Sequence, residues 1–282
     1  MSTAKQKKIY IPLGVLPKSL FFSVLLFNAQ FHFSFLKVIF MDYLNDFTSL
    51  VRRGVDDFNM ISEGDRIAVG VSGGKDSLVL LRSLAHLKTY YPKHFELSAI
   101  TLELGFEGMD YSPVAKMCEE LELPYYCIKT DIREIVFDVR KEDNPCSLCS
   151  KMRRGALNDA IKARGINKLA LGHHSDDVIE TFLLSLIFEG RISCFKPVTY
   201  MSRAEVWQIR PMIYADENTI AKLCSRLELP IVPNSCPEDK DSKRHEIKQL
   251  ISDLEADYPD IKAKIFGAIK RLPLEGWETV ER

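Results

Sequence analysis

From residue 41 onward, short apolar runs alternate with longer stretches in which apolar residues recur every three or four positions. The short runs have the length of buried strands and lie at 66–71, 96–102, 125–129 and 168–171. The three-to-four spacing predicts helices at 42–59, 76–90, 114–121, 153–164 and 177–188. Because strands alternate with helices, we predict an α/β fold with a doubly wound, mostly parallel sheet.

The pattern changes after residue 196. Two short apolar runs, 197–201 and 206–209, are separated by a polar turn, which predicts a hairpin added at one edge of the sheet. The last seventy residues show helical spacing only, at 220–227, 241–257 and 259–271. We therefore expect an α/β domain over residues 41–210 and a helical C-terminal region over residues 211–282.

The first forty residues are a different kind of sequence. They contain five lysines and no acidic residue, and residues 19–36 form an uncharged, phenylalanine-rich run. A signal peptide would need a small-residue cleavage site after the apolar run, and a membrane anchor would need about 20 apolar residues, whereas Asn28, Gln30 and His32 interrupt this one. We favour an extension outside the fold, with a membrane anchor or surface-binding segment, or a targeting peptide, as alternatives. We expect no stable membrane association.

Composition excludes several protein classes. The chain has 282 residues, 46% of them hydrophobic and 27% charged, which is typical of a globular protein rather than a fibrous or disordered one. Seven cysteines in 282 residues are too few for a disulfide scaffold, and an odd number cannot all pair. The net charge of −1 hides an uneven distribution, because the first forty residues carry +5. Near-neutrality therefore does not argue against a nucleic-acid partner.

The clearest motif follows the first predicted strand. It is Ser72-Gly73-Gly74-Lys75-Asp76-Ser77, which we call the phosphate loop. Two glycines allow a tight turn, the amide groups of a helix start attract anions, and the lysine and hydroxyls add donors. The spacing is not that of a Walker loop. It resembles the pyrophosphatase-type loop of ATP-dependent adenylating enzymes; the alternative is a glycine turn with a helix cap.

A second polar group follows the fourth predicted strand, in Gly172-His173-His174-Ser175-Asp176-Asp177. The carboxyl ends of parallel strands meet at one edge of the sheet, so this loop should lie beside the phosphate loop. Asp176 and Asp177 near a polyphosphate indicate a Mg²⁺ site, since Mg²⁺ prefers carboxylate, phosphate and water oxygens. Alternatively, the two acids favour the start of the helix electrostatically, or the histidines bind a transition metal.

The cysteines divide into two groups. Cys146 and Cys149 form a Cys-x-x-Cys, and Cys236 lies in another predicted loop, whereas the other four fall on apolar stripes or in apolar segments: Cys118, Cys127, Cys194 and Cys224. We expect these four in the core. One Cys-x-x-Cys suits a redox pair or half of a metal site, and three loop thiolates suit an iron–sulfur cluster with one iron open.

Three stretches together resemble the tRNA 2-thiocytidine synthetase family of the PP-loop ATP pyrophosphatase superfamily. They are the phosphate loop, the Cys-x-x-Cys followed by Arg153-Arg154-Gly155-Ala156-Leu157, and the stretch from Leu171 to Thr181. The resemblance runs from about residue 41 to 270. It implies an adenine nucleotide alpha hydrolase-like fold and ATP-dependent transfer of sulfur to C2 of an anticodon-loop cytidine in tRNA.

The resemblance also implies a site. ATP is expected on the phosphate loop and Gly172, Mg²⁺ on Asp176 and Asp177, and a 4Fe-4S cluster on Cys146, Cys149 and Cys236. Lys75, Arg153 and Asp177 are the expected catalytic residues. One departure concerns the third cysteine, which often belongs to a second Cys-x-x-Cys in bacterial members, whereas residue 239 is Asp239 here.

The expected partners follow from this activity. Transfer RNA needs basic contacts for its phosphates, for which Lys151, Arg154, Lys243 and Arg244 are candidates. The sulfur donor would be sulfide or a cysteine desulfurase, and the location would be cytoplasmic. Whether the protein forms a homodimer is left open by the sequence. The alternatives are a lysidine-synthetase-like ligase, another nucleoside thiolase, a small-molecule ATP pyrophosphatase and a nucleotide-binding redox sensor.

Overall fold

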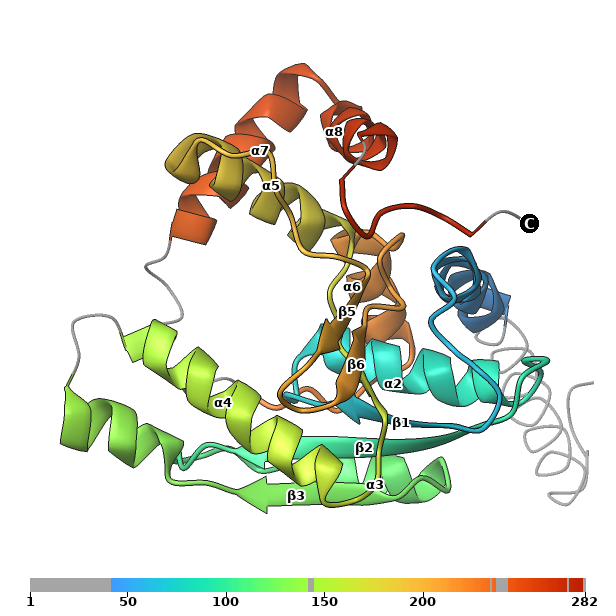
Figure 1. The fold of residues 1–282 in the computed structure, drawn as a ribbon, viewed down its shortest axis with the longest axis vertical. Helices are drawn as coiled ribbons and strands as arrows, with labels where there is room; N and C mark the ends of the chain where they lie inside the picture. The colour runs from blue at the N-terminus through green and yellow to red at the C-terminus, as the bar shows by residue number, and fades with distance from the viewer. Residues whose placement is uncertain (1–41, 142–144, 234, 237–242, 273, 281–282) are drawn as a thin grey trace, which may run out of the picture. The chain divides into compact units, whose positions relative to one another are not determined.

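A computed structural model describes residues 42–141, 145–233, 235–236, 243–272 and 274–280. Its centre is one six-stranded sheet with the order β3-β2-β1-β4-β6-β5. All neighbours run parallel except β5, which lies antiparallel to β6 at one edge. The predictions of a mostly parallel sheet and of an edge hairpin are confirmed (Figure 1).

The strands lie close to their predicted positions. They are β1 (Asp65–Gly70), β2 (Phe95–Glu103), β3 (Tyr125–Lys129), β4 (Lys168–Ala170), β5 (Val198–Met201) and β6 (Val206–Ile209). The central strand β1 is buried almost throughout, because helices cover both of its faces. This explains why the parallel strands appear in the sequence as continuous apolar runs.

The helices agree with the sequence pattern except around residues 134–150. After a first helix at residues 42–57, the chain forms α2 (Lys75–Lys88), α3 (Ser112–Glu120), α4 (Pro145–Lys162), α5 (Ser175–Glu189), α6 (Glu217–Arg226), α7 (Lys243–Asp257) and α8 (Ile261–Arg271). A seven-residue π-helix, Glu134–Arg140, was not predicted. Helix α4 begins eight residues earlier than predicted, so the Cys-x-x-Cys lies in its first turns rather than in a loop.

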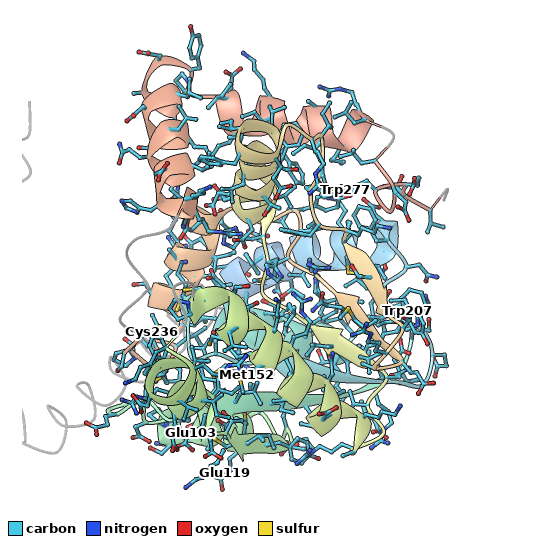
Figure 2. All side chains as sticks on the ribbon, turned by 60° about the vertical axis from the view of Figure 1, so that its left-hand side comes forward. Glu103, Glu119, Met152, Trp207, Cys236 and Trp277 are labelled. Atoms are coloured by element: carbon cyan, nitrogen blue, oxygen red, sulfur yellow. The ribbon has the colours of Figure 1, made fainter. Side chains whose placement is uncertain are left out.

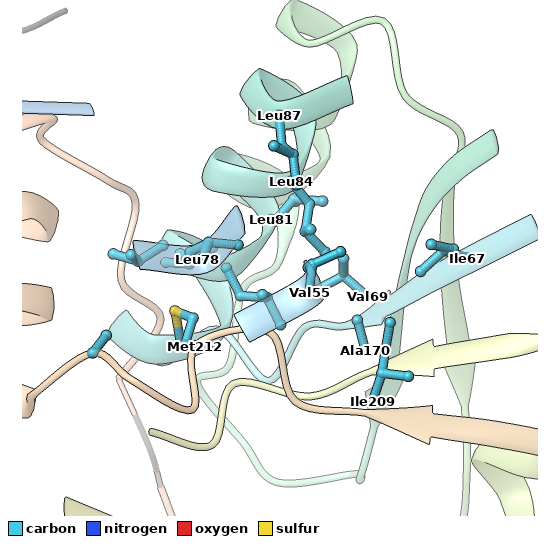
Figure 3. Packing of buried hydrophobic residues seen from close by; sticks show 14 of the residues in the cluster. Val55, Ile67, Val69, Leu78, Leu81, Leu84, Leu87, Ala170, Ile209 and Met212 are labelled. Carbon is cyan, nitrogen blue, oxygen red and sulfur yellow. The ribbon is translucent and has the colours of Figure 1, made fainter. Parts of the chain in front are cut away.

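The main hydrophobic core lies between α2 and the sheet. Leu78, Leu81 and Leu84 are fully buried in the same cluster as Val69 of β1 (Figure 3). The first helix joins this cluster through its predicted stripe, including Val51, which is fully buried. A second cluster, which includes residues of α4, covers the opposite face of the sheet. This packing fixes the loops at the carboxyl ends of β1 and β4, where ligands bind in such sheets.

The C-terminal helices do not form one separate layer. Helix α6 packs against α2, and α7 and α8 pack against α5 and against each other (Figure 1). Asp216 caps α6 by accepting a hydrogen bond from the Thr219 amide. Residues 44–282 form one compact unit, and the expected division after residue 210 stays a prediction.

The predictions for residues 1–40 lie outside the described residues. In the described part of the chain, no helix has the length and apolar character that crossing a membrane requires.

Candidate active site

The phosphate loop joins β1 to α2 and contains one backbone position that requires glycine. Gly73 has a φ of +85°, and a Cβ built there would lie 2.6 Å from Cβ of Val232. Gly74 has an ordinary φ of −77° and precedes the first residue of α2. The two glycines therefore differ, because only Gly73 combines a left-handed conformation with close contact to another segment.

The two serines of the loop bond mainly to the loop itself. The Ser77 hydroxyl donates to the Gly74 carbonyl at 2.9 Å and accepts from the Ser72 amide at 3.2 Å. The Ser72 hydroxyl accepts from the Gly74 amide at 3.3 Å. These bonds hold the turn in shape, so that the first amides of α2, which have no partner within the helix, are preorganised for an anion.

Lys75 lies in a group of carboxylates. Its Nζ is 2.9 Å from Glu217 Oε1 and 3.2 Å from Asp76 Oδ1. Burial opposes the charge of the ammonium, but the two carboxylates outweigh it and raise the pKa of Lys75. Lys75 is therefore charged at neutral pH and can transfer from these carboxylates to a phosphate. Sequence patterns did not single out Glu217, which begins α6, 142 residues away.

The loop between β4 and α5 lies against the phosphate loop, as predicted. A Cβ at Gly172 would come within 3.0–3.1 Å of backbone atoms of Asp76 and Ser77, so a glycine allows this approach. The buried His174 is the N-cap of α5, and its amide donates to Asp177 Oδ2 at 3.1 Å. Its Nε2 lies 3.4 Å from the same oxygen. The loop thus brings Asp177 toward the phosphate loop.

Asp176 has a different environment from Asp177. Its Oδ2 accepts from the Glu217 amide at 2.8 Å, and its Oδ1 lies 3.2 Å from Lys262 Nζ of α8. Its side chain is only 8% exposed. Both oxygens therefore join α5 to α6 and α8, which fits a structural role better than the predicted one in Mg²⁺ binding.

Two cations of α7 reach the acidic side of α5. Arg244 contacts Asp177 Oδ1 at 2.9 Å and Glu180 Oε2 at 3.2 Å. Lys248 lies 3.6 Å from Glu180 and 3.5 Å from Glu217. Burial raises the pKa of Glu180, and these cations oppose that rise. Arg244, which we predicted as a tRNA contact, bonds to the predicted catalytic acid.

A buried arginine, Arg210, is close enough to Asp177 for the two charges to interact. Arg210 directly follows β6, donates to the Lys196 carbonyl, and stacks over Phe195 with 4.9 Å from its Cζ to the ring centroid. Burial and the charge of Arg210 lower the pKa of His173 to about 4, so His173 is neutral at pH 7. No local motif marks Arg210, because its contacts join separate segments of the chain.

The cysteine pair lies in the first turns of α4, with Cys146 exposed and Cys149 half-buried. Burial raises the pKa of Cys149; the charge of Arg153 opposes the rise, and the thiolates of Cys236 and Cys146 add to it. The structure thus brings Cys236 near Cys149, although 87 residues separate them in the sequence. Figure 2 shows Cys236 near the start of α4.

The four cysteines predicted for the core behave differently from one another. Cys118 and Cys224 are buried, as predicted, and Cys194 is half-buried against the core. Cys127 is exposed, so its prediction was wrong. It belongs to β3, which lies at the edge of the sheet, and a strand there has a face that no helix fully covers.

The exposed basic residues of α4 face the same region. Burial raises the pKa of Tyr111, and the charge of Arg153 opposes this rise, which places Arg153 near Tyr111. Tyr111 in turn lies against Gly73, 3.4 Å from the position of a built Cβ. The charge of Arg154 adds to the effect of burial and lowers the pKa of Arg210, which places Arg154 near Arg210. Arg153 therefore lies near the phosphate loop, and Arg154 lies near Arg210, which acts on His173 of the second loop.

The arrangement combines an anion-binding loop, carboxylates and three thiols. Among the described residues, no three His, Cys, Asp or Glu side chains converge on one metal ion. A cluster has a different requirement, because each cysteine binds a separate iron. Cys149, which is affected by the thiolates of both Cys146 and Cys236, therefore fits a cluster better than a single-ion site.

Comparison with known proteins identifies close relatives. A family model described as the PP-loop domain matches residues 47–254. Proteins named tRNA-cytidine(32) 2-sulfurtransferase are similar: those of Pelobacter propionicus and Dichelobacter nodosus are each 38% identical, over 79% of this chain and 84% of theirs. Among solved structures, the U34-tRNA thiolase NcsA from Methanococcus maripaludis with its 4Fe-4S cluster has a TM-score of 0.67 and 27% identity, over 85% of this chain and 80% of NcsA.

Proposed function

Because the chain belongs to the PP-loop family of tRNA-cytidine(32) 2-sulfurtransferases, we propose that it uses ATP to replace the C2 oxygen of a tRNA cytidine with sulfur. The proposal is supported best by two neighbours of the phosphate loop: the loop that carries Asp177, which approaches it through Gly172, and Arg153, four residues after Cys149, which acts on Tyr111 beside Gly73. Adenylation needs the phosphate loop and Asp177, and the cysteines are needed only for sulfur transfer.

The first half of the reaction makes a leaving group. The C2 oxygen of the cytidine bonds to the α-phosphorus of ATP and pyrophosphate leaves. The amides at the start of α2 and Lys75 would hold the β,γ-phosphates, where their charge stabilises the departing pyrophosphate. A Mg²⁺ ion would suit Asp76 and Asp177, since Asp76 Oδ1 is buried and accepts no hydrogen bond, although Lys75 Nζ lies 3.2 Å from it, and Asp177 is partly accessible.

The second half exchanges oxygen for sulfur. A sulfur nucleophile bonds to C2, and AMP leaves with the original oxygen. Cys146, Cys149 and Cys236 would hold a 4Fe-4S cluster, which would supply an iron without a cysteine ligand to carry sulfur to the base. Arg153, near both Cys149 and Tyr111, would balance negative charge at the reacting base.

The partners are part of the same proposal. The tRNA would lie over the exposed residues Lys151 and Arg154 of α4, which border the site. The sulfur would come from sulfide or a cysteine desulfurase, and the enzyme would act in the cytoplasm; a homodimer belongs to the same proposal. Arg244 fits tRNA binding less well, because its guanidinium already bonds to Asp177 and Glu180.

The test separates cluster, adenylation and product. Protein purified without oxygen should contain iron and sulfide and, with ATP and sulfide, should convert unmodified tRNA to 2-thiocytidine, read by nucleoside mass spectrometry. Cys149→Ala should lose the cluster and the product, whereas Cys127→Ala, which removes another accessible thiol, should keep both. A thiolated uridine instead of cytidine would favour the activity named for NcsA. Absence of both cluster and thiolated nucleoside would refute the proposal.

A further inference from the structure

The segment between α6 and Cys236 contacts the phosphate loop before it reaches the cysteines. The Val232 amide donates to the Gly73 carbonyl at 2.9 Å. The Val232 side chain is 5% exposed and packs so closely on Gly73 that a Cβ there would lie 2.6 Å from Val232 Cβ and 3.0 Å from Cγ2. Val232 therefore supports the turn of the phosphate loop through both backbone and side chain.

This connecting segment, residues 229–236 without the undescribed residue 234, is held firmly at its start. The Leu229 amide donates to the Cys224 carbonyl of α6 at 3.1 Å, and the Leu229 side chain packs against the main core. At the other end lies Cys236, near Cys149. Pro230 and Pro233 restrict the backbone on both sides of Val232. Only three residues separate Val232 from Cys236, so a shift of Cys236 has a short path along the chain to Val232.

We propose that the connecting segment couples the two ligands of the site, so that a cluster on Cys236 seats Val232 on Gly73 and strengthens ATP binding. The proposal rests on the proposed function, which supplies both ligands. Val232 is then a positioning residue that acts through the backbone of the phosphate loop. Because coupling between two binding equilibria is reciprocal, bound ATP must also favour the cluster-loaded protein by the same factor.

The experiment measures nucleotide affinity with and without the cluster. The probe is α,β-methylene-ATP, which resists cleavage between its α and β phosphates, titrated calorimetrically without oxygen into the reconstituted protein and into the same protein after chelation of its iron. Iron and sulfide analysis reports the cluster content of each sample. For the wild type we expect at least fivefold tighter binding to the cluster-loaded form, within the usual range of coupling between sites.

Substitutions at neighbouring positions separate coupling from general damage. Val232→Gly removes the side chain that packs on Gly73 and should reduce the affinity ratio to below about twofold at unchanged cluster content. Ile231→Gly is the matched control, because that side chain is 56% exposed, and should keep the wild-type ratio. Val232→Ala serves as a milder variant if Val232→Gly does not fold. Its affinity ratio should lie below that of the wild type and above that expected for Val232→Gly.

The outcomes are distinguishable. A cluster-loaded wild type with an affinity ratio of one would refute the coupling and leave the proposed function standing. An unchanged ratio in both Val232 variants would refute the role of this residue, and with it the proposal. A protein that takes up no iron and sulfide would refute the cluster-dependent function and the coupling together.

Discussion

Replacing Gly73 by alanine would place a methyl group where the phosphate loop has no room for one. The residue has a φ of +85°, and an L-residue in a left-handed conformation costs about 1–2 kcal/mol. The new Cβ would also lie 2.6 Å from Cβ of Val232, and forcing such an overlap in a packed region costs about 1–3 kcal/mol. Together these effects should destabilise the protein by about 2–5 kcal/mol, or displace the loop and weaken ATP binding.

The neighbouring glycine is a matched control. Gly74 has a φ of −77°, and the nearest atom to a built Cβ is Ser72 Oγ at 3.5 Å, an ordinary contact. Gly74→Ala should therefore cost less than about 1 kcal/mol, the loss expected at a helix N-cap. Urea denaturation gives the free energies of unfolding, and titration with α,β-methylene-ATP gives the affinities.

A double-mutant cycle tests whether the overlap with Val232 is the cause. Val232→Gly removes the two atoms that would lie 2.6 and 3.0 Å from the new methyl group, so it should recover about 1–3 kcal/mol in the Gly73→Ala background, in stability or in binding. The strain from the positive φ should remain. A coupling energy within about 0.5 kcal/mol of zero in both measurements would refute the steric argument.

Three further predictions concern charge and chain length. Burial opposes ionisation of Glu217, but hydrogen bonding to Lys75 and the charge of Lys75 outweigh burial and lower the pKa of Glu217 to about 2. The stability from this pair should therefore be present above pH 4.5 and lost as the pH falls toward 2. Glu217→Gln should remove that part of the pH dependence in denaturation curves. Lys168→Met leaves Asp65, whose side chain is 6% exposed and lies 2.6 Å from the ammonium, as a buried charge without its counter-charge, so urea denaturation should show a loss of about 3–5 kcal/mol. Lys162→Met breaks an exposed pair and should cost far less. Equal losses for the two lysines would contradict the role of burial. A chain without residues 1–40 should keep its thermal midpoint and its activity, because the family match covers residues 47–254; a large drop in either would place those residues in the fold.

Much of the fold could be predicted because its elements are local patterns. The strand Tyr125–Lys129 and the hairpin strand Val206–Ile209 lie where the apolar runs predicted them. The start of α4 was missed because polar and small residues dominate its first turns, and helical periodicity was apparent only from Arg153 onward. Cys127 was misassigned because an apolar run shows that a strand exists but not whether its face is covered.

The candidate site likewise has parts that the sequence predicts and parts that only the tertiary structure determines. Each loop follows a strand, and parallel strands bring their carboxyl ends to one edge, so the sequence alone determined that the phosphate loop and Asp177 would meet. Only the tertiary structure decided which charges neutralise them. Glu217 reaches Lys75 from 142 residues away, and Arg244 reaches Asp177 from 67. These pairs depend on how α6 and α7 pack against α2 and α5, and no periodic pattern within a single helix records which surfaces will touch.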